Sequence, residues 1–168
     1  FANGDASIAT KASITGNYNT SDNARNVTLS ADGKTAFVAD NADGLDIIDI
    51  SDLANPTLTG TFDFSGSGHN PFEIALSADG KTAFVATYSG GLHVINISDL
   101  ANPTLTGNYD TSGIAKKVTL SADGKTAFVA DHSNGLDIIN ISDLANPTLI
   151  DTLDTSSDAY GVALSADG

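Results

Sequence analysis

Cysteine, methionine and tryptophan are absent from this chain of 168 residues. Without cysteine the chain can form neither a disulfide nor a thiolate metal site, and it has no thiol nucleophile. Basic residues are scarce: 7 Lys and Arg stand against 21 Asp and Glu, for a net charge of −14. A chain so acidic repels phosphate backbones and anionic lipids, so we expect no nucleic-acid partner. No apolar run is long enough to cross a bilayer, so we expect no membrane insertion.

Glutamate is almost absent as well, because Glu73 is the single Glu among the acidic residues. Aspartate favours turns, since its short carboxylate bonds to nearby backbone N–H groups, whereas glutamate favours helices. This imbalance predicts β-structure rather than helices. With abundant Gly, Ser, Thr and Asn and no cysteine, the composition is typical of an extracellular or cell-surface bacterial or archaeal protein.

Two strings of residues recur along the chain. LSADGKTAFVA stands at 29–39, 76–86 and 120–130, and a fourth copy begins at Leu164. ISDLANPTL stands at 50–58, 97–105 and 141–149. The units are 44 to 47 residues long, a period that indicates the blades of a β-propeller.

Each unit carries the pattern of four short strands. In the third unit we expect strands at 117–121, 126–130, 136–141 and 148–153, where polar and apolar residues alternate and Val, Ile, Thr and Phe are enriched. An Asp-Gly turn and a proline-containing turn separate them. The fold class predicted is therefore all-β, a propeller of four-stranded antiparallel blades with about four repeats.

The two ends of the chain supply the parts of one more blade. Residues 1–20 look like degraded second, third and fourth strands, and residues 161–168 supply a first strand. We expect a single domain over residues 1–168, with a split blade (1–23 plus 159–168) and full blades at 24–70, 71–114 and 115–158. The first blade would be completed by the C-terminal strand or by a partner chain. The chain would then be a closed ring, a half-ring completed by a second chain, or a piece of a longer propeller.

The recurring strings resemble two families of repeats. GLDIIDIS followed by DLANPTLTG is similar to the LVIVD repeat of bacterial and archaeal surface propellers, and LSADGKTAFVA resembles YVTN-type, lactonase-like propeller repeats. The resemblance covers three nearly identical units. It implies the propeller fold and says little about activity, because such folds serve many functions.

The loops divide into a constant set and a variable set. SADGK and SDLANPT are repeated unchanged on one face of the expected propeller, whereas the loops at 40–44, 87–91 and 131–135 and the links between blades differ. Loops on a rigid scaffold commonly carry binding residues. We call this second face the variable loop face and predict that it binds a ligand through its unusual residues, which are Arg25, His69, Phe72, Tyr88, Lys116, Lys117, His132 and Tyr160.

Catalytic and metal-binding signatures are weak. The three histidines have no metal-ligand spacing, and His93 replaces a third-strand aspartate, so we expect it to face solvent. The one candidate cation site is a calcium loop at residues 40–44 with Asp46 beyond it. Ala42 breaks the helix-loop-helix calcium pattern there. No G-x-S-x-G elbow marks a serine nucleophile. We therefore expect no catalytic residue and, apart from calcium at that loop, no cofactor.

These observations predict a non-enzymatic extracellular or cell-surface repeat module for protein interaction, adhesion or assembly. Its partner would be a protein or a glycan at the variable loop face, or a second copy through the blade edges. Two alternatives remain. The first is a glycan-binding module that uses the variable loop face, and the second is a fragment of a lactonase-like propeller enzyme.

Overall fold

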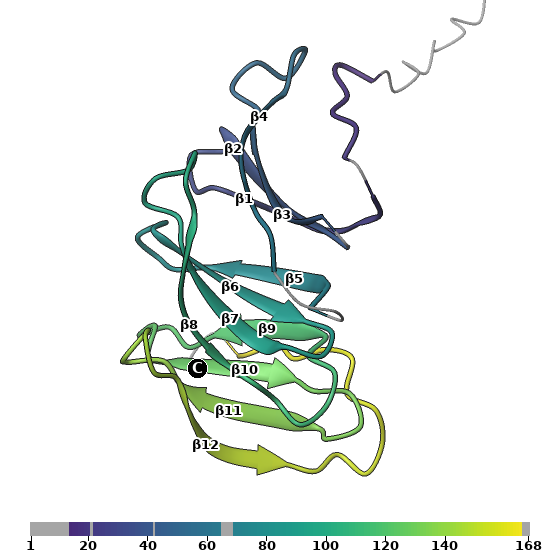
Figure 1. Cartoon of the computed structure of the whole chain (residues 1–168). Helices are drawn as coiled ribbons and strands as arrows, with labels where there is room; N and C mark the ends of the chain where they lie inside the picture. The colour runs from purple at the N-terminus through teal and green to yellow at the C-terminus, as the bar shows by residue number, and fades with distance from the viewer. Residues whose placement is uncertain (1–13, 21, 42, 65–68, 166–168) are drawn as a thin grey trace, which may run out of the picture.

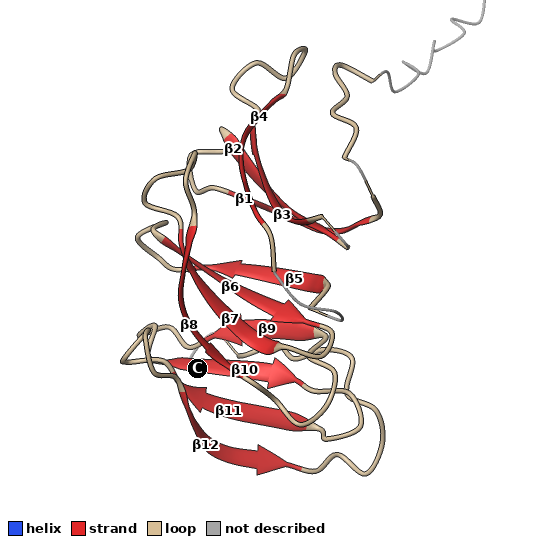
Figure 2. Cartoon of the chain, viewed as in Figure 1, coloured by secondary structure: helices blue, strands red, loops and turns tan. Residues whose placement is uncertain are grey.

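The computed structural model describes residues 14–20, 22–41, 43–64 and 69–165. Its regular elements are strands, arranged in three four-stranded antiparallel sheets (Figure 2). The part of the chain so described contains no helix of the length and apolar character needed to cross a membrane. The expected fold class is confirmed: each sheet is one propeller blade, with its strands in consecutive order.

The blades follow the repeats along the chain. Blade I consists of β1 (Ala24–Leu29), β2 (Thr35–Asp40), β3 (Gly44–Asp49) and β4 (Thr57–Phe62). Blade II consists of β5 (Pro71–Leu76), β6 (Thr82–Thr87), β7 (Gly91–Asn96) and β8 (Thr104–Tyr109). Blade III consists of β9 (Lys117–Leu120), β10 (Thr126–Ala130), β11 (Leu136–Asn140) and β12 (Thr148–Leu153). The strands of blade III end within one residue of the predicted bounds.

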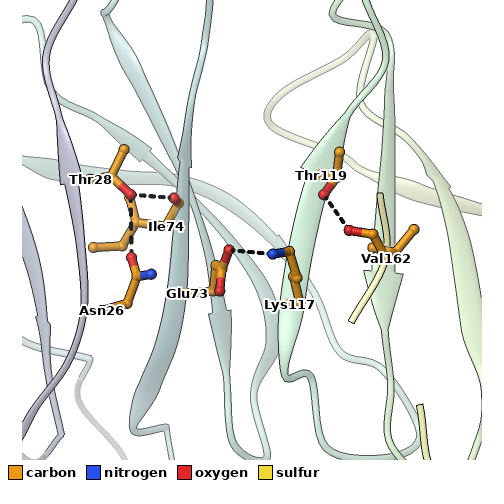
Figure 3. Close-up of polar contacts among 7 residues, drawn as sticks. All are labelled: Asn26, Thr28, Glu73, Ile74, Lys117, Thr119 and Val162. Carbon is orange, nitrogen blue, oxygen red and sulfur yellow. Dashed lines mark hydrogen bonds and ion pairs between the residues drawn. The ribbon is translucent and has the colours of Figure 1, made fainter. Parts of the chain in front are cut away.

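The first strands of successive blades lie beside one another (Figure 1). Side-chain bonds join them at corresponding positions, as Figure 3 shows. Thr28 Oγ1 donates to the carbonyl oxygen of Ile74 at 2.7 Å, and Thr119 Oγ1 donates to that of Val162 at 3.2 Å. Residues 161–165 therefore lie beside β9 as the inner strand of a following blade would.

The hydrophobic core lies between blades rather than within one. Alternating side chains of β2 and β3 face blade II, and the opposite set faces the segment before β1, because successive strand residues point to opposite sides of a sheet. Between blades I and II the largest buried side chains include Phe37, Leu45, Ile47, Ile74 and Ile95. Blades II and III are joined by an equivalent cluster, which includes Phe84, Leu92, Val94, Val129 and Ile139.

The segment before blade I and the fourth strands β4 and β8 each approach the following blade through a glycine. A Cβ atom at Gly16, Gly60 or Gly107 would lie 2.0, 2.3 or 2.5 Å from the carbonyl oxygen of a leucine in the next SDLANPT turn. These distances are shorter than a side chain tolerates, so the glycine is required for the backbones to pack this closely. Blade III has Asp151 at the corresponding position.

The described parts of the expected split blade lie apart, residues 14–20 beside blade I and residues 161–165 beside β9 of blade III (Figure 1). Residues 14–20 occupy the place of a fourth strand before blade I: Gly16 contacts the Leu53 turn, and Tyr18 packs against Ala36, Val38 and Ile48. Residues 161–165 lie at blade III. The described residues thus form three full blades of a partial propeller, and completion of the split blade stays a prediction.

Candidate functional site

The first strand of each blade, which we call its inner strand, has one extra residue near its start. In blade I the register between β1 and β2 shifts at Arg25, and in blade II it shifts between β5 and β6 at Phe72. In blade III the N–H of Lys116 donates to the carbonyl of Ala130, which also faces Lys117 in the ladder. Such bulges turn a side chain away from its regular direction and often border functional sites. Tyr160 stands at the same distance before its LSADG string.

Bulge residues of three blades meet around one aromatic ring. The Arg25 guanidinium carbon lies 4.2 Å from the centroid of the Phe72 ring, and Lys116 Nζ lies 3.9 Å from it. Phe72 stacks on Tyr88 with 6.1 Å between ring centroids, and Lys116 Nζ is 5.6 Å from the Tyr88 ring. These four residues, called here the cation–aromatic cluster, all belong to the predicted binding set.

An asparagine that the sequence analysis did not single out fixes the position of Arg25. Asn41 Oδ1 accepts hydrogen bonds from Arg25 Nε at 3.0 Å and from Nη2 at 2.6 Å, and Asn41 Nδ2 donates to Asp22 Oδ2 at 2.8 Å. Asn41 could have been found by alignment, because it occupies in blade I the loop position of Tyr88 in blade II and His132 in blade III. Each blade thus supplies two variable side chains, one at the bulge of its first strand and one in the loop between its second and third strands.

The charges of this region are unevenly compensated. Lys117 forms an ion pair with Glu73, with Nζ 3.3 Å from Oε1, across the boundary between blades II and III (Figure 3). Among the described residues, no carboxylate oxygen lies within 4.0 Å of the Arg25 guanidinium or of Lys116 Nζ. Lys116 is half-buried, and burial, followed by the charge of Arg25, lowers the pKa of its ammonium group.

A second group lies where the loop after β10 meets the segment after β12. His132 Nε2 is 3.3 Å from Asp158 Oδ2, and its ring meets that of Tyr160 edge to face with 5.3 Å between centroids. Backbone bonds in both directions between His132 and Ala159 hold the two segments together. The backbone N–H of Lys116 donates to the carbonyl of Ala130, the last residue of β10, and His132 follows two residues later. The sequence analysis identified His132 and Tyr160 but missed Asp158.

His69 is not part of either group. It faces His93 with 5.5 Å between ring centroids, and His93 in turn meets Phe64 edge to face. The expectation that His93 faces solvent is wrong, since its side chain is 6 % exposed. From β7 its ring packs against Phe64, and its Nδ1 lies 3.3 Å from Thr87 Oγ1. Burial, with a smaller effect of His69, lowers the pKa of His93 to about 4.

One carboxylate of the calcium candidate, that of Asp40, bonds to the backbone. Asp40 Oδ2 accepts the N–H of Asp22, and the equivalent Asp131 accepts Thr111 Oγ1 at 2.7 Å and the N–H of Gly113 at 2.8 Å. These bonds tie blades I and III to the links that precede them. Ala42 lies outside the described residues, and the part that is described holds no group of three or more metal-ligating side chains.

The family of the chain follows from its repeats. The model of the LVIVD repeat matches residues 22–64, 74–111 and 112–155, one match to each blade. The chain therefore belongs to the LVIVD-repeat family, as the recurring strings indicate. The comparison with curated proteins found no match.

The solved structures that superpose on this chain include longer chains of several kinds. The periplasmic gluconolactonase PpgL of Pseudomonas aeruginosa superposes with a TM-score of 0.70 at 17 % identity, over 81 % of this chain and 41 % of its own. A proposed 6-phosphogluconolactonase of Bacteroides fragilis gives 0.69 at 19 %, over 80 % and 40 %. Hydrazine synthase of Kuenenia stuttgartiensis gives 0.66 at 20 %, over 92 % and 40 %. The chain thus spans about two fifths of the length of these structures.

The comparison corrects the main functional expectation. We expected a non-enzymatic module for interaction, adhesion or assembly, and that expectation is wrong: the similar solved structures include a gluconolactonase and a proposed 6-phosphogluconolactonase. They favour the lactonase-like alternative instead. At these identities the likeness shows the fold alone, so the expectation that the chain is not an enzyme has no support and its enzymatic status is open.

Proposed function

We propose that this chain is part of a propeller hydrolase that opens small lactones or related esters at the variable loop face. The observation that carries the proposal is the His132–Asp158 pair, with its 3.3 Å contact, on the blade that also bears Lys116. A carboxylate that bonds one ring nitrogen of a histidine orients the ring and leaves the other nitrogen as a base.

The roles follow from ordinary ester hydrolysis. His132 Nδ1 takes a proton from water as the water oxygen attacks the carbonyl carbon of the lactone. The resulting oxyanion collapses, the ring C–O bond breaks, and the histidine returns the proton to the leaving alkoxide. Asp158 is a positioning residue in this scheme. Lys116 belongs to the same blade, with its Nζ over the rings of Phe72 and Tyr88.

The test is a steady-state assay of the full protein with an aldonolactone and an aryl ester. We expect His132→Gln to lower kcat/KM by at least about 100-fold, the contribution of a well-placed general base. Asp158→Asn should lower it about tenfold, because the ring loses the carboxylate that orients it. His69→Gln, in the separate histidine pair, is the matched control and should keep full activity. Absence of turnover, or equal activity of His132→Gln, contradicts the proposal.

We also propose that the protein works outside the cytoplasm. The support is the composition, together with the periplasmic location stated for the P. aeruginosa gluconolactonase that shares the fold. Fractionation of the native host, followed by immunoblotting against this chain, should recover it in the periplasmic or secreted fraction. Recovery with a cytoplasmic marker contradicts this location.

A further inference from the structure

The cation–aromatic cluster concentrates positive charge in a strongly acidic protein. The chain carries a net charge of −14. Three of its seven basic residues, Arg25, Lys116 and Lys117, lie at the starts of the inner strands. The other described cations, Lys34, Lys81 and Lys125, stand exposed in the repeated SADGK turns on the opposite face. Their position is explained by the repeat, whereas that of Arg25 and Lys116 is not.

Two like charges beside one ring repel each other unless something compensates them. The Phe72 ring attracts both cations through its π face, at 4.2 Å and 3.9 Å from its centroid, and Asn41 holds Arg25 through a neutral oxygen. Neither contact neutralises a charge. Burial lowers the pKa of the Lys116 ammonium group, and the charge of Arg25 lowers it further. An anion placed between the two cations would relieve it.

The donors that remain suit the oxygens of a small anion. Within the described residues, Arg25 donates hydrogen bonds through Nε and Nη2, both to Asn41 Oδ1, so Nη1 is the donor that can meet a further acceptor. Lys116 contributes a compact charge with three N–H donors, and Tyr88, 43 % exposed, adds a phenol beside it. Phosphate and carboxylate groups both meet this donor set.

We infer that Arg25 and Lys116, with Phe72 and Tyr88, form a subsite for the anionic group of the substrate, a phosphate or a carboxylate carried by a small lactone. The choice of a lactone rests on the proposed function, whereas the anion subsite rests on the cluster itself. Because the remainder of the molecule repels anions, binding there requires local charge and cannot come from the general field of the protein.

The direct test is titration calorimetry of the full protein with inorganic phosphate and, separately, with gluconate, at low ionic strength, where screening is weak. We expect a single site for at least one of them. Lys116→Met should weaken its binding by at least about tenfold, and so should Arg25→Gln, since each removes one of two charge-assisted contacts. Preference for phosphate or for gluconate identifies the type of anionic group.

Lys125→Met is the matched control. It removes the same charge from an exposed turn of the same blade on the opposite face, so the affinity should stay within twofold of the wild type. Thermal melting establishes that all three variants are folded. Absence of binding by both anions, or equal weakening by Lys125→Met, overturns the subsite.

A parallel assay separates this inference from the proposed function. We expect the full protein to hydrolyse a lactone with a phosphate or carboxylate group at higher kcat/KM than its neutral counterpart, and Lys116→Met to narrow that ratio by at least about fivefold. Hydrolysis of both lactones with an unchanged ratio in Lys116→Met overturns the subsite and leaves the hydrolase. Anion binding that depends on Lys116 without turnover of either lactone supports the subsite and overturns the hydrolase.

Discussion

Replacement of Gly60 by alanine is expected to lower the free energy of unfolding by about 3 kcal/mol, the upper range for forcing extra atoms into a packed interface. The new Cβ would lie 2.3 Å from the carbonyl oxygen of Leu100 and 3.1 Å from two backbone atoms of Ala101. A backbone turn cannot rotate away as a side chain does. Blade II must therefore move from blade I and expose part of the core between them. Denaturant unfolding followed by circular dichroism measures the loss.

Gly161→Ala is the matched control for this variant. Neither Gly60 nor Gly161 has a left-handed backbone in the structure, and at Gly161 the nearest atom to the added Cβ is the flexible Cδ of Lys117 at 3.6 Å. We expect a change of less than about 0.5 kcal/mol there, as for other surface substitutions. If Gly60→Ala is as stable as Gly161→Ala, the blades do not pack through this contact.

His93 should make the stability of the protein fall in mild acid. Its pKa is about 4 in the folded protein against 6.5 for an unperturbed histidine, so the unfolded chain binds more protons between these values. Stability from this group is therefore complete above pH 6.5 and is lost as the pH falls toward 4. The difference corresponds to about 3 kcal/mol at 1.4 kcal/mol per pKa unit. His93→Gln, which cannot be protonated, should lose correspondingly less between pH 7 and pH 4.

The comparison of His93→Gln with the wild type isolates the titration of His93 from that of the many aspartates.

Asp137 stands at the equivalent position of blade III, and burial raises the pKa of its carboxyl. Protonation there favours the folded state, so the wild type should gain stability relative to Asp137→Asn as the pH falls toward 4. Denaturant unfolding at several pH values measures both. Parallel curves for the wild type and His93→Gln would show that His93 titrates normally.

Most of the fold could be predicted because three nearly identical units carry the same pattern of strands and turns. Near-identical strings fix the period, and the alternation within each unit gives strands whose ends agree with the structure to within one residue in blade III. The burial of His93 could not be predicted by the same reasoning. A polar residue in an alternating strand reads as solvent-facing, but in a propeller both faces of a blade are covered by neighbours.

The grouping of the site residues was predicted only in part. Sequence placed eight residues on one face, and the structure brings Arg25, Phe72, Tyr88 and Lys116 together while His69 lies apart. The distance to the LSADG string, which is the same for Arg25, Phe72, Lys116 and Tyr160, could have identified the bulge residues, but it does not identify Tyr88. Contacts such as Asn41 with Arg25 join residues of one blade through a bulge, which no alternating pattern reports.

Asp151 limits how the repeats could have multiplied by duplication. Blades that end in Gly60 or Gly107 accept a following SDLANPT turn, so a copy of either unit can be inserted between them and meet the same surface on both sides. A unit placed after β12 would bring its turn against an aspartate side chain instead of a bare α-carbon. The repeated SDLANPT turn therefore fits against β4 and β8, whereas against β12 it would need room for the Asp151 side chain.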